Sequence, residues 1–151
     1  MTPTIFDYFR RYRRDNPKIS AEDALRWARS SVAVDAISRQ IDWLTESDNH
    51  RLLDIGRLDE IEVRVYIDDE PYDWGDCEPS PDDCANLEVI GVGVRVVDDI
   101  DDLDAIWSVA YFDHDYRRAA IETAVDFGFI ELARNEISER ARLAGYVETE
   151  R

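Results

Sequence analysis

Hydrophobic residues recur with two different periods along the chain, and the change of period separates helical from strand-forming regions. After Ser20, positions Leu25, Ala28 and Val32 follow the three-four spacing of one helix face. Ser20, with an acidic residue three positions later, resembles a capping box. The pattern predicts a long helix that begins after Ser20 and ends near Thr45.

A shorter helix is predicted ahead of it. Thr4 can cap a helix over residues 5–14, and Asn16 followed by Pro17 ends it. Residues 46–59 are mostly polar and show neither period, so we interpret them as a connection.

From Ile61 the period changes to two. Apolar and polar residues alternate over residues 61–68, as in a strand with one face on the core. Residues 87–97 are rich in valine and predict the central strand, in which Gly91 and Gly93 would permit a bulge or the close approach of a packed helix. A third strand is predicted over residues 106–112. Because the strands are joined by short connections, we expect antiparallel pairing.

The last predicted element is a helix that Asp113 or Asp115 caps and that runs to about residue 143, with Gly128 as a possible kink and Gly145 as its stop. The predicted fold is therefore a single α+β domain over residues 1–151. It has a three-stranded antiparallel sheet with N-terminal and C-terminal helices packed on one face.

The net charge of the chain argues against some classes of binding partner. Eighteen basic and 35 acidic residues give a net charge of −17 and an isoelectric point near 4.3. Nucleic acids and anionic membranes are bound by basic surfaces, so we expect neither as a direct partner. The sequence shows no apolar run of membrane-spanning length and no leader pattern at its start, so the expected location is the cytoplasm.

The acidic excess is concentrated in the middle third. Residues 1–60 carry ten basic and eleven acidic side chains, whereas residues 61–104 carry two basic and fifteen acidic ones. The acids form two bunches, one from Asp68 to Asp83 and one from Asp98 to Asp104. Both bunches follow strand-like runs, so a hairpin would bring them to the same edge of a sheet.

We expect these two bunches to bind a basic protein surface, with Trp74 as a hydrophobic anchor set among carboxylates. The alternative for Trp74 is that it folds back over the sheet edge. The predicted partner-binding residues are Asp68, Asp69, Glu70, Asp73, Trp74, Asp76, Glu78, Asp82, Asp83, Asp98, Asp99, Asp101, Asp102 and Asp104.

Signatures of catalysis, metal binding and cofactor binding are absent from the sequence. His50 and His114 do not lie in a nucleophile motif, and Cys77 and Cys84 lack the spacing of a structural zinc site. We therefore predict no catalytic residues, no metal and no cofactor, and expect both thiols to be free. The basic cluster at residues 10–14 is compatible with two roles: it contacts nucleic acid, or it forms ion pairs with the acidic loops within the chain or in an oligomer.

The segment from Tyr72 to Asp76, the glycine-interrupted valine strand and the strand Ile106–Val109 together resemble small acidic accessory proteins of phages and other mobile elements. The resemblance covers the latter half of the chain and does not extend residue by residue to a named family. Some such proteins are DNA mimics, including anti-CRISPR and antirestriction proteins, which present carboxylates where phosphates would lie.

The leading hypothesis is thus an inhibitor that engages a nucleic-acid-binding surface of a host defence complex, such as a CRISPR effector, by acidic mimicry. Two alternatives stand beside it. One is an acidic structural or interaction domain of a salt-loving organism, which the single lysine beside seventeen arginines favours and the near-neutral first sixty residues disfavour. The other is a small enzyme whose site is assembled from residues far apart in the sequence.

Overall fold

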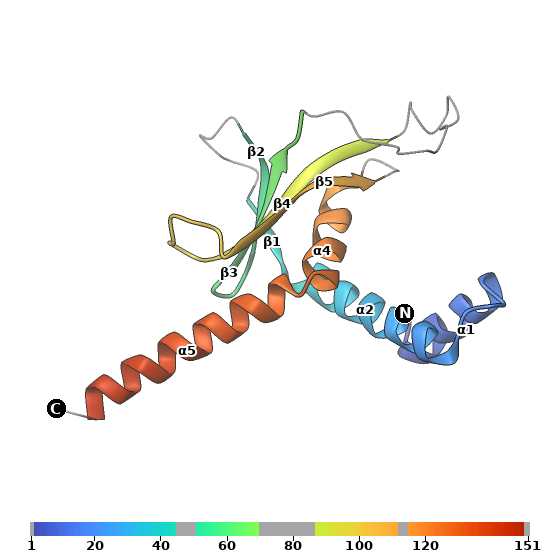
Figure 1. The fold of residues 1–151 in the computed structure, drawn as a ribbon, viewed down its shortest axis with the longest axis horizontal. Coiled ribbons are helices and arrows are strands. Elements are labelled where there is room, and N and C mark those ends of the chain that lie inside the picture. Colours follow the sequence, from blue (N-terminus) through green and yellow to red (C-terminus); the bar gives the residue numbers. More distant parts are fainter. Residues whose placement is uncertain (1, 45–50, 70–86, 112–114, 150–151) are drawn as a thin grey trace. The chain divides into compact units, whose positions relative to one another are not determined.

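The computed structural model describes residues 2–44, 51–69, 87–111 and 115–149 (Figure 1). By its internal contacts the chain divides into two compact units, residues 1–41 and residues 42–151.

The first unit is a pair of helices, α1 (Ile5–Asp15) and α2 (Ala21–Gln40), that contact each other. Both predicted caps are confirmed: Thr4 accepts a hydrogen bond from the backbone of Asp7, and Ser20 accepts one from the backbone of Asp23. Between the helices, the Tyr8 hydroxyl donates to Asp35 at 2.5 Å. The hairpin is thus held by capped ends and by polar contacts of its aromatic residues.

The second unit contains a five-stranded antiparallel sheet among the described residues, in the order β1-β2-β3-β4-β5 (Figure 1). Its strands are β1 (Asp42–Trp43), β2 (Leu52–Leu58), β3 (Ile61–Ile67), β4 (Glu88–Val96) and β5 (Asp104–Tyr111). The predicted α+β class is correct, but the prediction of three strands is wrong.

The two additional strands occupy stretches that we had assigned to the helix and to a connection. Helix α2 ends at Gln40 because Ile41 is extended, and Asp42 then pairs with Arg57 of β2. In β2 the inward positions include Asp54 and Gly56, paired with Val65 and Val63 of β3. A buried acid and a glycine at core positions hide the alternation that would have identified the strand.

Asp54 is buried in the core because three donors satisfy its carboxylate. The Tyr116 hydroxyl lies 2.9 Å and the Arg117 Nε 2.8 Å from Oδ2, while the backbone N–H of Ile55 lies 2.9 Å from Oδ1. A buried carboxylate is tolerated when hydrogen-bond donors satisfy its oxygens. This contact ties β2 to the start of the first C-terminal helix.

The predicted C-terminal helix is divided in two. Helix α4 (Tyr116–Asp126) begins at the cap Asp115, as predicted, and α5 (Phe129–Thr149) begins after Gly128, whose φ is +71°. A left-handed residue breaks the helical ladder, so the expected kink is a full interruption. Both helices contact β3 and β4.

The core of this unit lies between α4, α5 and one face of the sheet. On that face Val63 pairs with Val94 and Val65 with Val92, and all four side chains are fully buried. The alternation predicted for residues 61–68 is therefore confirmed. It leaves the intervening residues of β3 and β4 on the opposite face.

Candidate protein-interaction face

The sheet face opposite α4 and α5 carries charged and aromatic side chains, and we call it the aromatic–arginine face. Its members are set by the register of the central strands: Glu62 pairs with Arg95, Arg64 with Gly93, and Tyr66 with Gly91. Because side chains alternate between the two faces of a strand, these positions point away from the valine core.

Glu62 is the residue that orients the arginine side chains of this face. Its side chain is fully buried, and its carboxylate receives Arg95 Nε at 2.7 Å on Oε1 and Arg57 Nε at 3.3 Å on Oε2. Arg64 Nε lies 3.3 Å from the same Oε1. Three guanidinium groups thus converge on one carboxylate, which orients the arginines and leaves local positive charge beside them.

Trp107 is held on this face by a bulge in β5. Val92 pairs with Ile106 and Ile90 with Val109, so two residues of β5, Trp107 and Ser108, oppose the single residue Gly91. The indole covers Gly91 so closely that a Cβ there would lie 2.5 Å from its Cε3. The predicted close approach at Gly91 is therefore made by an indole ring, not by a packed helix.

The Trp107 side chain remains accessible although its position is fixed. Its ring centroid lies 5.3 Å from that of Tyr66, and 52% of the residue is exposed. A large aromatic residue that is both rigid and half exposed loses little conformational entropy when a partner covers it.

Asp102 lies beside this aromatic pair. The Tyr66 hydroxyl donates to its Oδ2 at 2.5 Å, and a Cβ at Gly93 would lie 2.5 Å from the same oxygen. Burial, together with this hydrogen bond, raises the pKa of Tyr66 to about 12. Oδ1 of Asp102 is buried and has no hydrogen-bond partner among the described residues.

Asp68, which belongs to the acidic bunch from Asp68 to Asp83, contacts the bulge of β5 that carries Trp107. Its Oδ2 accepts a hydrogen bond of 2.8 Å from the backbone N–H of Ser108, whose φ is +58°. Asp68 and Asp102 are far apart in the sequence, yet each is fixed at the Tyr66–Trp107 pair. The structure therefore brings one carboxylate of each bunch together.

The other described members of the second bunch have different surroundings. Asp99 accepts from both terminal nitrogens of Arg140 on α5, at 2.8 and 3.1 Å, and this guanidinium lowers the pKa of the carboxyl. Asp104 accepts from the backbone of Ala105, at the start of β5. Asp98 lies in a turn with φ of +73°, and Asp101 is exposed. Helix α5 thus neutralises Asp99 internally.

Asp69 is exposed beyond the end of β3. The remaining predicted partner-binding residues lie outside the described residues, as do both histidines and both cysteines: Glu70, Asp73, Trp74, Asp76, Glu78, Asp82, Asp83, His50, Cys77, Cys84 and His114.

Sequence reasoning missed Trp107, Tyr66 and the arginines around Glu62. The sequence pattern indicates only that Trp107 lies in a strand and that Arg64 and Arg95 are the two basic residues of the acidic region 61–104. The one usable signal was Gly91 within a valine-rich strand, because such a glycine marks a place where another group approaches the backbone. Which group approaches it depends on the register of β5.

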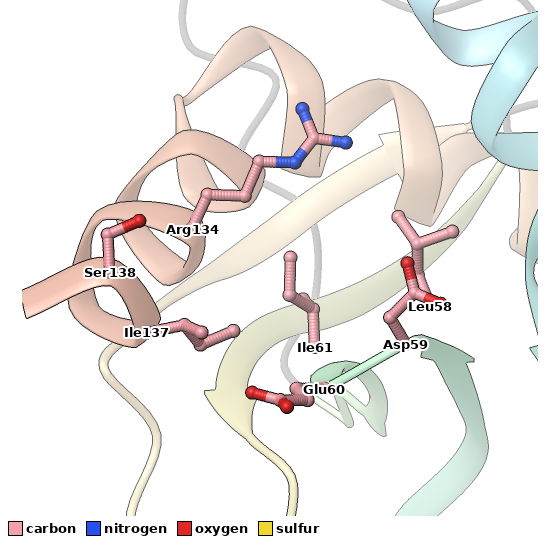
Figure 2. Close-up of a pocket in the computed structure, with 7 residues that line it drawn as sticks. All are labelled: Leu58, Asp59, Glu60, Ile61, Arg134, Ile137 and Ser138. Carbon is pink, nitrogen blue, oxygen red and sulfur yellow. The ribbon is translucent and has the colours of Figure 1, made fainter. Parts of the chain in front are cut away.

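Hollows lined by described residues lie beside the sheet, and two of them are large enough to hold a ligand group. Figure 2 shows the first, about 380 Å³, where Ile137 of α5 reaches toward Ile61 and the Arg134 guanidinium extends above them. Asp59 and Glu60 of the β2–β3 turn form its rim. The second, about 500 Å³, lies between β5 and α4 and is lined by residues that include Tyr111 and Asp126.

Within the ranges that the structure describes, no three His, Cys, Asp or Glu side chains are arranged to hold a metal ion. None of the described helices is long and apolar enough to cross a membrane. Comparison of the chain with protein-family models, curated proteins and solved structures finds no match.

Proposed function

We propose that this protein is a binding module that docks its aromatic–arginine face, with Trp107 as anchor, onto a basic surface of a partner protein. The observation that carries the proposal is that one carboxylate from each acidic bunch, Asp68 and Asp102, is fixed next to the half-exposed Trp107. Asp68 accepts a hydrogen bond from the backbone N–H of Ser108, which follows Trp107 in the chain, and Asp102 accepts one from the hydroxyl of Tyr66, whose ring lies against that of Trp107.

The arrangement combines the two components of a fast and specific interface. A rigid aromatic anchor supplies a large apolar contact, and replacing such a residue by alanine usually costs much of the binding free energy. The carboxylates around it attract a positively charged partner and speed its association. Residues 70–86 join the end of β3 to the start of β4 and contain six acids and no lysine or arginine, so the sequence next to Asp68 adds further negative charge.

The arginines around Glu62 do not contradict an acidic binding role. The side chains of Arg64 and Arg95 are only 16% and 15% exposed, and the three guanidinium groups are turned toward the Glu62 carboxylate. We propose that their contribution is to hold the sheet surface rigid around Glu62, from which Arg64 extends against the Tyr66 ring. A rigid surface binds with a smaller entropic cost than a mobile one.

We further propose that the partner is a nucleic-acid-binding protein of a host defence complex, such as a CRISPR effector, and that binding is inhibitory. A net charge of −17 makes the chain a competitor for surfaces that bind phosphates. The resemblance of its latter half to acidic accessory proteins of mobile elements favours the same class.

Capture from a host lysate tests this function. The immobilised protein is expected to retain a nucleic-acid-binding complex at about 50 mM NaCl and to lose most of it at about 500 mM, because screening weakens attraction between opposite charges. Added double-stranded DNA is expected to release the same complex. Trp107→Ala should reduce retention at low salt by about tenfold or more.

The matched control is Trp27→Ala, which removes a tryptophan of similar exposure, 45%, from helix α2 of the other unit. Retention should be unchanged in that variant. Capture that ignores both salt and DNA, or equal loss in the two tryptophan variants, would contradict the proposal.

A further inference from the structure

Strand β5 forms one edge of the sheet among the described residues, since β4 pairs with it on one side and no described strand pairs on the other. An edge strand presents backbone N–H and C=O groups that another extended segment can pair with. The bulge at Trp107 and Ser108 divides this edge, and Val109 to Tyr111 form the part that lines the 500 Å³ groove against α4.

The groove has an apolar side and an acidic side. Val109 and Tyr111 of β5 face Phe127, which is 59% exposed at the end of α4. Among the described residues that line the groove, helix α4 and its cap contribute the acids Asp115, Glu122 and Asp126 and one cation, Arg118. The formal balance of these four groups, three negative and one positive charge, is −2.

The three acidic side chains of the groove differ in whether a cation or a hydrogen-bond donor of the chain already contacts them. Glu122 pairs with Arg118 at 3.0 Å, and Asp115 accepts from the backbone N–H of Arg118 as the helix cap. Asp126 makes no ion pair with any described residue, and partial burial raises the pKa of its carboxyl. A partly shielded carboxylate without a cation is stabilised when a lysine or arginine enters beside it.

We propose that the groove between β5 and α4 binds an extended segment of the basic partner, which adds to the sheet as a strand beside β5 and places a lysine or arginine against Asp126. Apolar side chains of the segment contact Val109 and Phe127. Main-chain pairing supplies affinity and the alternating side chains supply selectivity, as in other cases of strand addition. The inference rests on the proposed function because it assigns a recognition element to the same basic partner.

Charge complementarity selects this occupant over a second copy of the chain. A second copy would bring another protein of charge −17 against a groove that is itself negative. Like charges brought together at an interface oppose association. A segment that alternates basic and apolar residues matches both sides of the groove.

A defined peptide tests the groove directly. The probe is a fluorescent ten-residue peptide that alternates lysine and valine, measured by fluorescence anisotropy against the full chain at low salt. Two matched probes are a glutamate–valine peptide and a lysine–valine peptide that is N-methylated at every peptide bond, so that neither edge of the strand keeps its N–H groups. Only the unmodified lysine–valine peptide is expected to bind well, and the N-methylated one about tenfold or more weaker, since it cannot pair with an edge strand.

Variants of the chain locate the binding. Asp126→Asn should weaken the lysine–valine peptide by about threefold to tenfold. Asp59→Asn removes one charge at the other hollow, in a left-handed position that asparagine tolerates, and should leave binding unchanged. Hydrogen exchange of the backbone amides in residues 104–111 should slow when the peptide is bound.

The outcomes separate this inference from the proposed function. If the natural partner is captured in a salt-sensitive and Trp107-dependent way but Asp126→Asn and exchange in β5 are unaffected, the groove proposal is overturned and the binding function stands. If β5 amides are protected by self-association without peptide, the occupant is a second copy and the proposal is also overturned. If neither the peptide nor any basic partner binds, both proposals fail.

Discussion

Glu62 is the residue on which the aromatic–arginine face depends. A carboxylate that is fully buried is costly unless it is paired, and here three arginines pair with it across β2, β3 and β4. The same contacts hold the three arginine side chains in fixed positions, and Arg64 also lies against the ring of Tyr66. The main effect of this ion cluster is therefore to restrict the motion of these side chains, and its net contribution to the free energy of folding is smaller.

Ionisation of Tyr66 makes the free energy of unfolding depend on pH in the alkaline range. Its pKa is raised to about 12 by burial and by the hydrogen bond to Asp102, whereas an unfolded tyrosine ionises near 10. The folded state therefore holds this proton more tightly, so the associated stability is complete below about pH 10 and is lost as the pH rises from about 10 toward 12.

We predict that Tyr66→Phe lowers the free energy of unfolding by about 1 kcal/mol near neutral pH, because the Asp102 carboxylate loses its donor. The difference from the wild type should shrink between about pH 10, where the tyrosine of the unfolded chain ionises, and about pH 12, where that of the folded chain ionises. Urea unfolding at several pH values measures both. A difference that stays constant to pH 12 would show that Tyr66 is not the group responsible.

At the scale of elements, the bulge in β5 decides what the face presents. Without it, Ile106 and Trp107 would continue the regular alternation and Val109 would leave the core side. With it, Ile106 and Val109 both pair toward the core face, and Trp107 and Ser108 are displaced together opposite Gly91. The bulge thus places the indole and directs the Ser108 N–H to Asp68.

Gly91→Ala tests this arrangement. The new Cβ would lie 2.5 Å from the Trp107 ring, so the ring must move away from the sheet. We expect a loss of stability of about 2 kcal/mol, a changed indole resonance of Trp107 and weaker partner capture. Gly145→Ala is the control, since nothing lies within 4 Å of its Cβ position and alanine favours a helix. An unchanged Trp107 signal in Gly91→Ala would contradict the packing described for this face.

The elements also show where sequence patterns succeed. Strands β3 and β4 and the helix caps Thr4, Ser20 and Asp115 were predictable, because their signals are local. Strand β2 was not, because Asp54 occupies an inward position and becomes tolerable only when Tyr116 and Arg117 approach it from α4. Those partners are more than sixty residues away in the sequence.

At the scale of the whole molecule, the net charge of −17 produces a repulsion that opposes the compact folded state. Part of the acid is neutralised internally, at Glu62 by three arginines and at Asp99 by Arg140. The described core is an ordinary close-packed set of valine, isoleucine and alanine side chains. Such a core supplies the stability that self-repulsion opposes, without a need for high salt.

We therefore predict cooperative thermal unfolding in dilute buffer at neutral pH, with a midpoint that rises by only a few degrees, roughly 5 °C, as salt screens the repulsion. Circular dichroism at 10 mM and 1 M NaCl measures this. A chain that folds only in molar salt would instead be an acidic domain adapted to a saline cell, and the binding proposal would lose its electrostatic basis.

The sequence by itself determined the α+β class, the central pair of strands, the helix caps and the concentration of acid in residues 61–104, because each of these is set by composition or by neighbours a few positions away. The tertiary structure alone decided that Asp68 and Asp102 meet at Trp107, that arginines surround Glu62, and that β5 lies at an edge beside α4. These features depend on strand register and on one bulge, and a shift of one residue in register moves a side chain to the opposite face of the sheet.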